Sequence, residues 1–236
     1  MRLKIYITGT SSGIGKALAE KALAAGHRVV GISRRRNIEH PDYKHTRVDL
    51  ANLDQYVGLN FDDDRDVDAL ALVNNAGTLG DVKPVKRLHP EKVAHSYQLN
   101  IAAPTILTGL FIDNTDGTPK TRTVLNISSG AGSYPIASWS TYCASKAALD
   151  MFTRVLRVDH PAVRSFSVGP GIVDTEMQGE IRRQPQDDFP DVRRFQDYKE
   201  AGELAAPEEV ARKLLYILEH PADFEEPCFS LREVDI

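Results

Sequence analysis

A tyrosine and a lysine four residues apart could carry acid–base chemistry in this chain. Tyr142 and Lys146 end the segment SSGAGSYPIASWSTYCASK, and the alanine-rich stretch after them favours a helix. Residues four apart project from the same helix face, so the phenol and the ammonium would be neighbours. A nearby cation favours the phenolate and would lower the tyrosine pKa from about 10, toward the range useful for proton transfer near neutral pH. Taken alone, the pattern also fits an ordinary pair on a helix surface.

The start of the chain has the pattern of a nucleotide-binding turn. An apolar, β-branched segment, Leu3 to Thr8, runs directly into TGTSSGIG, and a helical apolar pattern follows. In this strand, turn and helix, Gly9 permits a tight turn, Gly13 lets the backbone approach a ligand, and Gly15 allows close packing. Free amides at the helix N-terminus could then bind a pyrophosphate. The spacing G-x-x-x-G-x-G differs from the generic G-x-G-x-x-G fingerprint.

The end of the second expected strand, residues 27–33, bears on which dinucleotide would fit. This strand follows at the distance of a βαβ unit, so its end should reach the adenosine ribose. An NAD site would place an acidic residue there to accept the ribose hydroxyls. This chain has Ser33 and Arg34 instead, a hydroxyl donor and a guanidinium suited to a 2′-phosphate. They predict NADP(H), although the run Arg34 to Arg36 also fits a solvated basic turn.

The rest of the chain alternates between expected strands and helices. Strands are expected at 46–48, 69–73, 123–127, 163–168 and 228–231, and helical segments at 53–59, 92–110, around residue 142 and at 207–218. This alternation predicts one α/β domain over residues 1–236, a Rossmann-type doubly wound parallel sheet of about seven strands with helices on both faces. Residues 37–46 lack helical periodicity and predict a crossover shortened to a loop. Residues 178–205 are polar and contain two prolines, which predicts an irregular, mobile covering segment on the substrate side.

Composition and charge exclude several classes of function. The chain has 236 residues and a net charge of −4 spread along the sequence, which suggests no nucleic-acid surface. We expect no signal sequence, no membrane helix and a cytoplasmic location. Two isolated cysteines and scattered histidines predict no metal site. Asp62, Asp64 and Asp66 resemble the start of a calcium loop, but Val67 takes the glycine position and Val73 the final glutamate position.

Several motifs in order resemble the short-chain dehydrogenase/reductase family over nearly the whole chain. They are TGTSSGIG, the NNAG of residues 74–77, Asn100, Ser129 thirteen positions before Tyr142, and the PGIVDT of residues 170–175. Within the family, NISSGAG, SWSTYCASKAALDM and GPGIVDTEMQ resemble the sepiapterin reductase and bacterial benzil reductase branch. Relatives commonly have a helix where residues 35–46 form the shortened crossover, and this departure bears on how adenine would pack.

The resemblance implies an NADP-linked carbonyl reduction. Tyr142 would be the acid, Lys146 would lower its pKa and hold the nicotinamide ribose, and Ser129 would polarise the carbonyl. Asn100 would complete a proton relay, and the thirteen-residue interval favours Ser129 over Ser128. These roles suit the chemistry, because hydride delivery to a carbonyl builds an alkoxide that needs hydrogen-bond donors and a proton.

The resemblance also implies which residues contact NADPH or NADP+. They come from the glycine turn, the ends of the early strands, the catalytic pair and the PGIVDT segment: Gly9, Ser11, Ser12, Gly13, Ile14, Gly15, Ser33, Arg34, Asp49, Leu50, Asn75, Ala76, Gly77, Tyr142, Lys146, Pro170, Gly171, Val173 and Thr175. It further implies a homodimer or homotetramer, assembled through the helices of Asn100 and Tyr142.

The substrate class follows from residues beside the catalytic ones. Tyr134, Trp139 and Met177 could form an aromatic, apolar pocket wall, or they could pack in the core. Sepiapterin reductases anchor the pterin with an aspartate on the last strand. An ungapped count places Leu231 at that position, and reaching Asp235 would need a shift of four residues. We therefore expect a ketone or a vicinal dicarbonyl of the benzil kind, with pterin reduction as the alternative.

Two other classes of protein fit the sequence less well. A non-catalytic NADP(H)-sensing regulator would keep the fold but would have no need of Ser129, Tyr142 and Lys146 together. A serine hydrolase is disfavoured because the sequence contains no G-x-S-x-G elbow.

Overall fold

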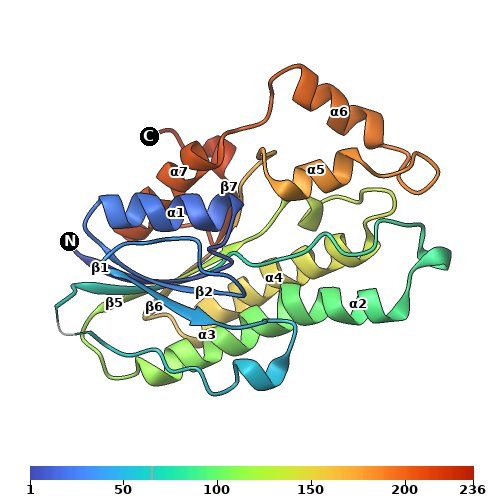
Figure 1. Cartoon of the computed structure of the whole chain (residues 1–236). Helices are drawn as coiled ribbons and strands as arrows, with labels where there is room; N and C mark the ends of the chain where they lie inside the picture. Colours follow the sequence, from blue (N-terminus) through green and yellow to red (C-terminus); the bar gives the residue numbers. More distant parts are fainter. Residues whose placement is uncertain (65) are drawn as a thin grey trace.

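Seven parallel strands form the sheet at the centre of the structure, a computed structural model that describes residues 1–64 and 66–236 (Figure 1). Their order across the sheet is β3-β2-β1-β4-β5-β6-β7, and every neighbouring pair is parallel. The strands are β1 (Leu3–Thr8), β2 (Arg28–Ser33), β3 (Tyr43–Arg47), β4 (Ala69–Asn74), β5 (Thr121–Ile127), β6 (Val163–Gly169) and β7 (Cys228–Ser230). The predicted doubly wound parallel sheet is confirmed.

Helices cover both faces of this sheet, as Figure 1 shows. On one face lie α1 (Gly13–Ala24) and α7 (Pro207–Glu219), and on the other lie α2 (Pro90–Tyr97), α3 (Ala103–Asn114) and α4 (Ser140–Asp159). Successive side chains of a strand point to opposite faces. Ile5 and Ile7 of β1 are therefore buried against α1 and α7, while Tyr6 contacts Phe111 of α3.

Ion pairs occupy the acidic turn that resembled a calcium loop. Asp62 pairs with Lys4, Asp63 with Lys120, and Asp64 with Arg28. Within residues 1–64 and 66–236, no cluster of three or more His, Cys, Asp or Glu side chains could hold a metal ion. The carboxylates of the turn therefore form ion pairs at the amino end of the sheet with basic side chains of β1 and β2 and with the lysine that precedes β5.

Three expected elements differ from the structure. The single helix expected over residues 92–110 is α2, a π-helical turn at Gln98–Ala102, and α3. The helical segment expected at 53–59 is one 3-10 turn, Leu53–Gln55, whereas the strand expected at 46–48 is the longer β3. The loop expected in the second crossover is confirmed, because no helix forms between β2 and β3.

The segment expected to be irregular, residues 178–205, contains helical structure. It holds most of α5 (Glu176–Arg182) and all of α6 (Val192–Glu200). The expectation was wrong because polar composition hid a few apolar side chains, Ile181, Phe189, Val192 and Phe195, that are buried together with Trp139. Among the described residues, no helix is both long and apolar enough to cross a membrane.

A pair of glycine substitutions tests the close packing of the glycine turn. A Cβ on Gly15 would overlap Gly9 O and the Asn75 side chain, whereas one on Gly58 would meet nothing within 4 Å. We predict that Gly15→Ala lowers the free energy of unfolding by about 1–3 kcal/mol, the usual cost of overpacking. Gly58→Ala should change it by less than about 0.5 kcal/mol. Urea denaturation measures both, and equal effects would contradict this packing.

Candidate active site

A cleft of about 1080 Å³ opens at the carboxyl ends of the strands. Open α/β sheets bind their ligands at this edge. Nearly all of the predicted site residues line the cleft, although they are spread from Gly9 to Thr175 along the chain. Two predicted residues, Asn100 and Gly15, lie outside its lining.

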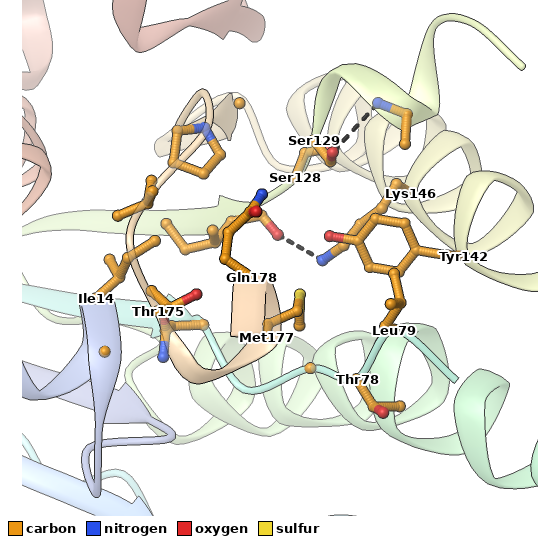
Figure 2. A pocket seen from close by; sticks show the side chains of 18 of the residues that line it. Ile14, Thr78, Leu79, Ser128, Ser129, Tyr142, Lys146, Thr175, Met177 and Gln178 are labelled. Carbon is orange, nitrogen blue, oxygen red and sulfur yellow. Dashed lines mark hydrogen bonds between the residues drawn. The ribbon is translucent and has the colours of Figure 1, made fainter. Parts of the chain in front are cut away.

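Tyr142 and Lys146 project from α4 into this cleft. Their exposed fractions are only 7% and 6%, which rules out the simple surface pair. The Lys146 ammonium donates a hydrogen bond to Ile127 O at 2.8 Å and lies 5.6 Å from the centre of the Tyr142 ring. Figure 2 shows Ser129, Tyr142 and Lys146 on one side of the cleft, with Ile14 and Thr175 across from them.

Burial shifts the pKa values of both groups. Desolvation raises the pKa of Tyr142 to about 12, an effect that the Ser129 hydroxyl partly offsets. Desolvation lowers the pKa of Lys146 to about 8, and the Asp150 carboxylate opposes that change. The pKa of Tyr142 therefore lies above its ordinary value, opposite to the expected direction, because burial of the phenol is the largest effect. The role of Lys146 in stabilising the phenolate stays a prediction. A pKa near 12 keeps the phenol protonated at neutral pH, as a proton donor requires.

The end of β5 presents two consecutive serines. Ser129 begins a 3-10 turn, Gly130–Gly132, and its hydroxyl accepts a hydrogen bond from Ala131 N at 3.2 Å. This hydroxyl also lies close enough to Tyr142 to oppose the rise in its pKa. The Ser128 hydroxyl is buried and has no hydrogen-bond partner among the described residues. The choice of Ser129 over Ser128 stays a prediction.

Asn100 anchors the loop after β4 instead of facing the cleft. Its side chain donates to Thr78 O and accepts from Thr78 N, both at 2.8 Å. It also donates to the Ser145 hydroxyl at 3.2 Å, which links this loop to α4. The π-helical turn places Asn100 in this buried position, and such turns are frequent at functional sites. A proton relay through Asn100 stays a prediction.

The glycine turn forms a cradle that fits a dinucleotide. Gly9 and Gly13 adopt positive φ angles of 75° and 56°, which side chains other than glycine disfavour. A Cβ on Gly13 would come within 3.3 Å of Thr175, so the PGIVDT segment closes against the turn. The residues predicted on the adenosine side and on the nicotinamide side line the same cleft as this turn: Ser33, Arg34, Asp49 and Leu50, and Pro170, Gly171, Val173 and Thr175. The chain's own residues therefore fit such a cofactor.

The two candidate 2′-phosphate ligands differ in availability. Arg34 is exposed and lines the cleft. Ser33 is buried, and its hydroxyl donates to Arg35 O at 2.9 Å and lies 3.1 Å from His45 Nε2. Sequence reasoning missed Asn37, whose amide donates to Ser11 O at 2.7 Å and fastens the shortened crossover to the glycine turn.

Aromatic and apolar side chains form the wall beside Tyr142. The Trp139 ring packs edge-on against Tyr142 at 5.5 Å and also contacts Phe189 and Phe195. Trp139 is therefore both buried in the core and part of the cleft lining, so the two expectations for it both hold. Met177 lines the cleft from α5, and Tyr134, which is 62% exposed, lines it from the loop after β5.

The sequence offered no signal for several other wall residues. These are Leu79, Ile136, Ile181 and Phe195, which come from four separate segments. The count along the last strand was also misleading. Leu231 is 2% exposed and packs in the core beside α7, and Asp235 is exposed but does not line the cleft. Glu233, which was not considered, is the carboxylate after β7 that does line it.

Comparisons with known proteins agree with this geometry. The short chain dehydrogenase family matches residues 4–186. Benzil reductase ((S)-benzoin forming) of Bacillus subtilis is 38% identical over 229 residues, covering 92% of this chain and 94% of that protein. Sepiapterin reductase of Bos taurus is 36% identical over 243 residues, covering 93% and 90%.

Solved structures give the same result for the fold. The KRED1-Pglu enzyme superimposes with a TM-score of 0.77 at 27% identity, covering 92% of this chain and 94% of that one. Aldohexose dehydrogenase of Thermoplasma acidophilum gives 0.81 at 23% identity, covering 98% and 92%. The family supports a nicotinamide cofactor and a small-molecule substrate. The chain thus belongs to the short-chain dehydrogenase/reductase family, in its benzil and sepiapterin reductase-like branch, and is an oxidoreductase acting on CH–OH or C=O groups.

Proposed function

We propose that this protein is an NADPH-dependent reductase of ketones or vicinal dicarbonyls, with a preference for aromatic or otherwise apolar substrates. The main observation behind the proposal is that Tyr142, buried and protonated, lies beside the apolar wall of the cleft. The Ser129 hydroxyl and the Lys146 ammonium lie beside it in the same cleft.

These side chains can complete a carbonyl reduction. When bound, the nicotinamide supplies a hydride to the carbonyl carbon. Negative charge then grows on the carbonyl oxygen, where the Ser129 hydroxyl donates a hydrogen bond and Tyr142 donates its proton. The charge on Lys146 stabilises the phenolate that remains. With a pKa of about 8, Lys146 is mostly charged at pH 7, and Tyr142 is protonated throughout the neutral range.

The residue at the end of β2 supports NADPH as the cofactor. Arg34 lines the cleft at the end of β2, where an NAD site would hold an acidic residue. Because the Ser33 hydroxyl is engaged in internal contacts, we assign the 2′-phosphate contact chiefly to Arg34. A guanidinium binds phosphate through charge-assisted hydrogen bonds.

The wall beside Tyr142 supports an aromatic or apolar substrate. Trp139, Ile136 and Met177 place apolar surface where a substituent of the carbonyl would lie. We further propose that residues 178–205, with α6, cover this end of the cleft. The 38% identity to a benzil reductase agrees with a bulky dicarbonyl.

Pterin reduction is the second candidate, and Glu233 favours it. This carboxylate lines the cleft after β7, so it could accept hydrogen bonds from pterin ring N–H groups.

A non-catalytic NADP(H)-sensing role is disfavoured. Burying an ammonium beside a phenol is costly in solvation free energy, and a protein that only binds NADP(H) does not need that arrangement.

The surface of α4 supports assembly. Met151, Val155 and Val158 are 56%, 48% and 80% exposed, and such apolar side chains favour a homodimer or homotetramer through α3 and α4. Sedimentation velocity measures the oligomeric state directly.

The unpaired Cys143 and Cys228 are consistent with a reducing compartment, and we keep the cytoplasm as the proposed location.

Removing one hydroxyl tests the proton donor. Tyr142→Phe keeps the ring that packs on Trp139 but deletes the acid, so turnover should fall by at least about 100-fold. NADPH affinity, measured by fluorescence, should stay nearly unchanged. Full activity in the phenylalanine variant would reject the role of Tyr142.

Two arginine substitutions test the cofactor preference. Arg34→Ala should weaken NADPH binding by about ten- to a hundredfold, the usual worth of a charge-assisted contact, and should affect NADH little. Arg36→Ala is the matched control, because Arg36 does not line the cleft and instead pairs with Glu39. Equal losses for NADPH and NADH in Arg34→Ala would leave Arg34 as a solvated turn residue.

A substrate panel separates the two candidate reactions. We predict a higher kcat/KM for benzil or phenylpropanedione than for sepiapterin, measured by NADPH oxidation. A preference for sepiapterin would overturn the dicarbonyl proposal. If Glu233→Gln then removed the pterin activity, the carboxylate after β7 would be the pterin anchor.

A further inference from the structure

A row of polar side chains crosses the sheet on the face that carries α3 and α4. Its members are paired directly across β4, β5, β6 and β7: Asn74, Asn126, Ser167 and Cys228. Ser167 and Cys228 line the cleft, whereas Asn74 and Asn126 lie outside its lining. Asn74 donates to Thr108 of α3 at 3.2 Å, and Asn126 donates to Thr153 of α4 at 2.9 Å. The row therefore anchors α3 and α4 on the sheet.

Asp150 is the charged partner of this row. The Ser167 hydroxyl donates to its Oδ1 at 2.6 Å, and the Cys228 thiol lies 3.6 Å from its backbone O. A Cβ on Gly132 would come within 2.8 Å of Asp150 Oδ2, so the carboxylate lies against the turn that begins at Ser129. Asp150 thus contacts the sheet and the Ser129 turn at once.

Asp150 also continues the catalytic face of α4. Tyr142, Lys146 and Asp150 follow one another at intervals of four residues, so they lie on successive turns of one face. All three line the cleft. The order along the helix is phenol, ammonium, carboxylate, which places Lys146 between its partner in catalysis and a negative charge.

The surroundings of Lys146 offer little else to stabilise an ammonium. β5 presents Ile127 O, and α4 presents Tyr142 and Asp150. The π-helical turn presents the neutral side chain of Asn100, which lies near Gly77. In the described part of the chain, no carboxylate lies within 4.0 Å of the Lys146 ammonium. Burial lowers the Lys146 pKa, and Asp150 is the neighbour that raises it.

Asp150 itself faces few other charged groups. Arg154 follows it by one turn of α4 and also lines the cleft. Cys228 faces it from β7, and burial raises the pKa of that thiol. The thiol is therefore neutral at pH 7.

We propose that Asp150 is a positioning residue whose carboxylate, held by Ser167, keeps Lys146 as an ammonium beside Tyr142. The inference rests on the proposed function, in which Lys146 acts as a cation. The polar row itself anchors α4 through neutral groups, whereas its partner Asp150 adds a charge. A charge one helical turn from a buried ammonium acts strongly because the dielectric of the interior is low.

The first test measures the ionisation of Lys146 without any substrate. Lysine Cε resonances of the ¹³C-lysine-labelled protein would be titrated from pH 6 to pH 10, with Lys146→Met to assign the signal. We expect a midpoint near 8 in the unsubstituted protein. In Asp150→Asn, which keeps an acceptor for Ser167 and removes the charge, it should be at least about half a pH unit lower.

Thr153→Val is the matched control. It removes a neutral contact between α4 and the same row, the Asn126 hydrogen bond, so it should lower thermal stability and leave the Lys146 midpoint in place. An unchanged midpoint in Asp150→Asn, or an equal shift in both variants, would reduce Asp150 to a structural anchor and overturn the proposal. If Asp150→Asn does not fold, Asp150→Ser provides the same comparison.

The second test is the pH profile of carbonyl reduction. An ammonium is lost as pH rises through its pKa, so the alkaline fall of kcat/KM should move to lower pH in Asp150→Asn and not in Thr153→Val. If no carbonyl compound is reduced at all, the proposed function fails, while the lysine titration still decides the role of Asp150.

Discussion

The buried ammonium of Lys146 is the constraint on which the site depends. Taking a charged group out of water is costly unless hydrogen bonds and opposite charge replace the lost solvation. Here β5 contributes the Ile127 carbonyl, and α4 contributes Asp150 one turn away. The close approach of these elements needs Gly132, where a side chain would strike the carboxylate. The position of α4 on the sheet therefore decides which groups stabilise the charge of Lys146.

The same helix placement aligns the two halves of the cleft. The polar row across β4 to β7 holds α3 and α4 against one face, while apolar side chains of β1 pack α1 and α7 against the other. Because all strands are parallel, their carboxyl ends meet at one edge. The glycine turn after β1 and the predicted catalytic residues after β5 then face a single cleft. Asn100 adds a link between the loop after β4 and α4.

The apolar wall of the cleft depends on a different part of the molecule. The aromatic cluster of Trp139, Phe189 and Phe195 joins α4 to the segment that carries α5 and α6. Trp139 of this cluster packs edge-on against the Tyr142 ring, and burial raises the pKa of that phenol. One packing arrangement thus both shapes the apolar wall and helps to bury Tyr142.

The sequence by itself determined the order of the strands, the glycine turn and the predicted set of Ser129, Tyr142 and Lys146, because these depend on local periodicity and short spacings. Tertiary structure decided the features that depend on burial. Desolvation reversed the expected direction of the Tyr142 pKa, internal hydrogen bonds engaged Ser33, and a few apolar side chains organised residues 178–205 into helices. It also placed Glu233 in the cleft where counting along the chain had pointed to Leu231. Solvation and side-chain direction are set by neighbours distant in sequence, so no local pattern encodes them.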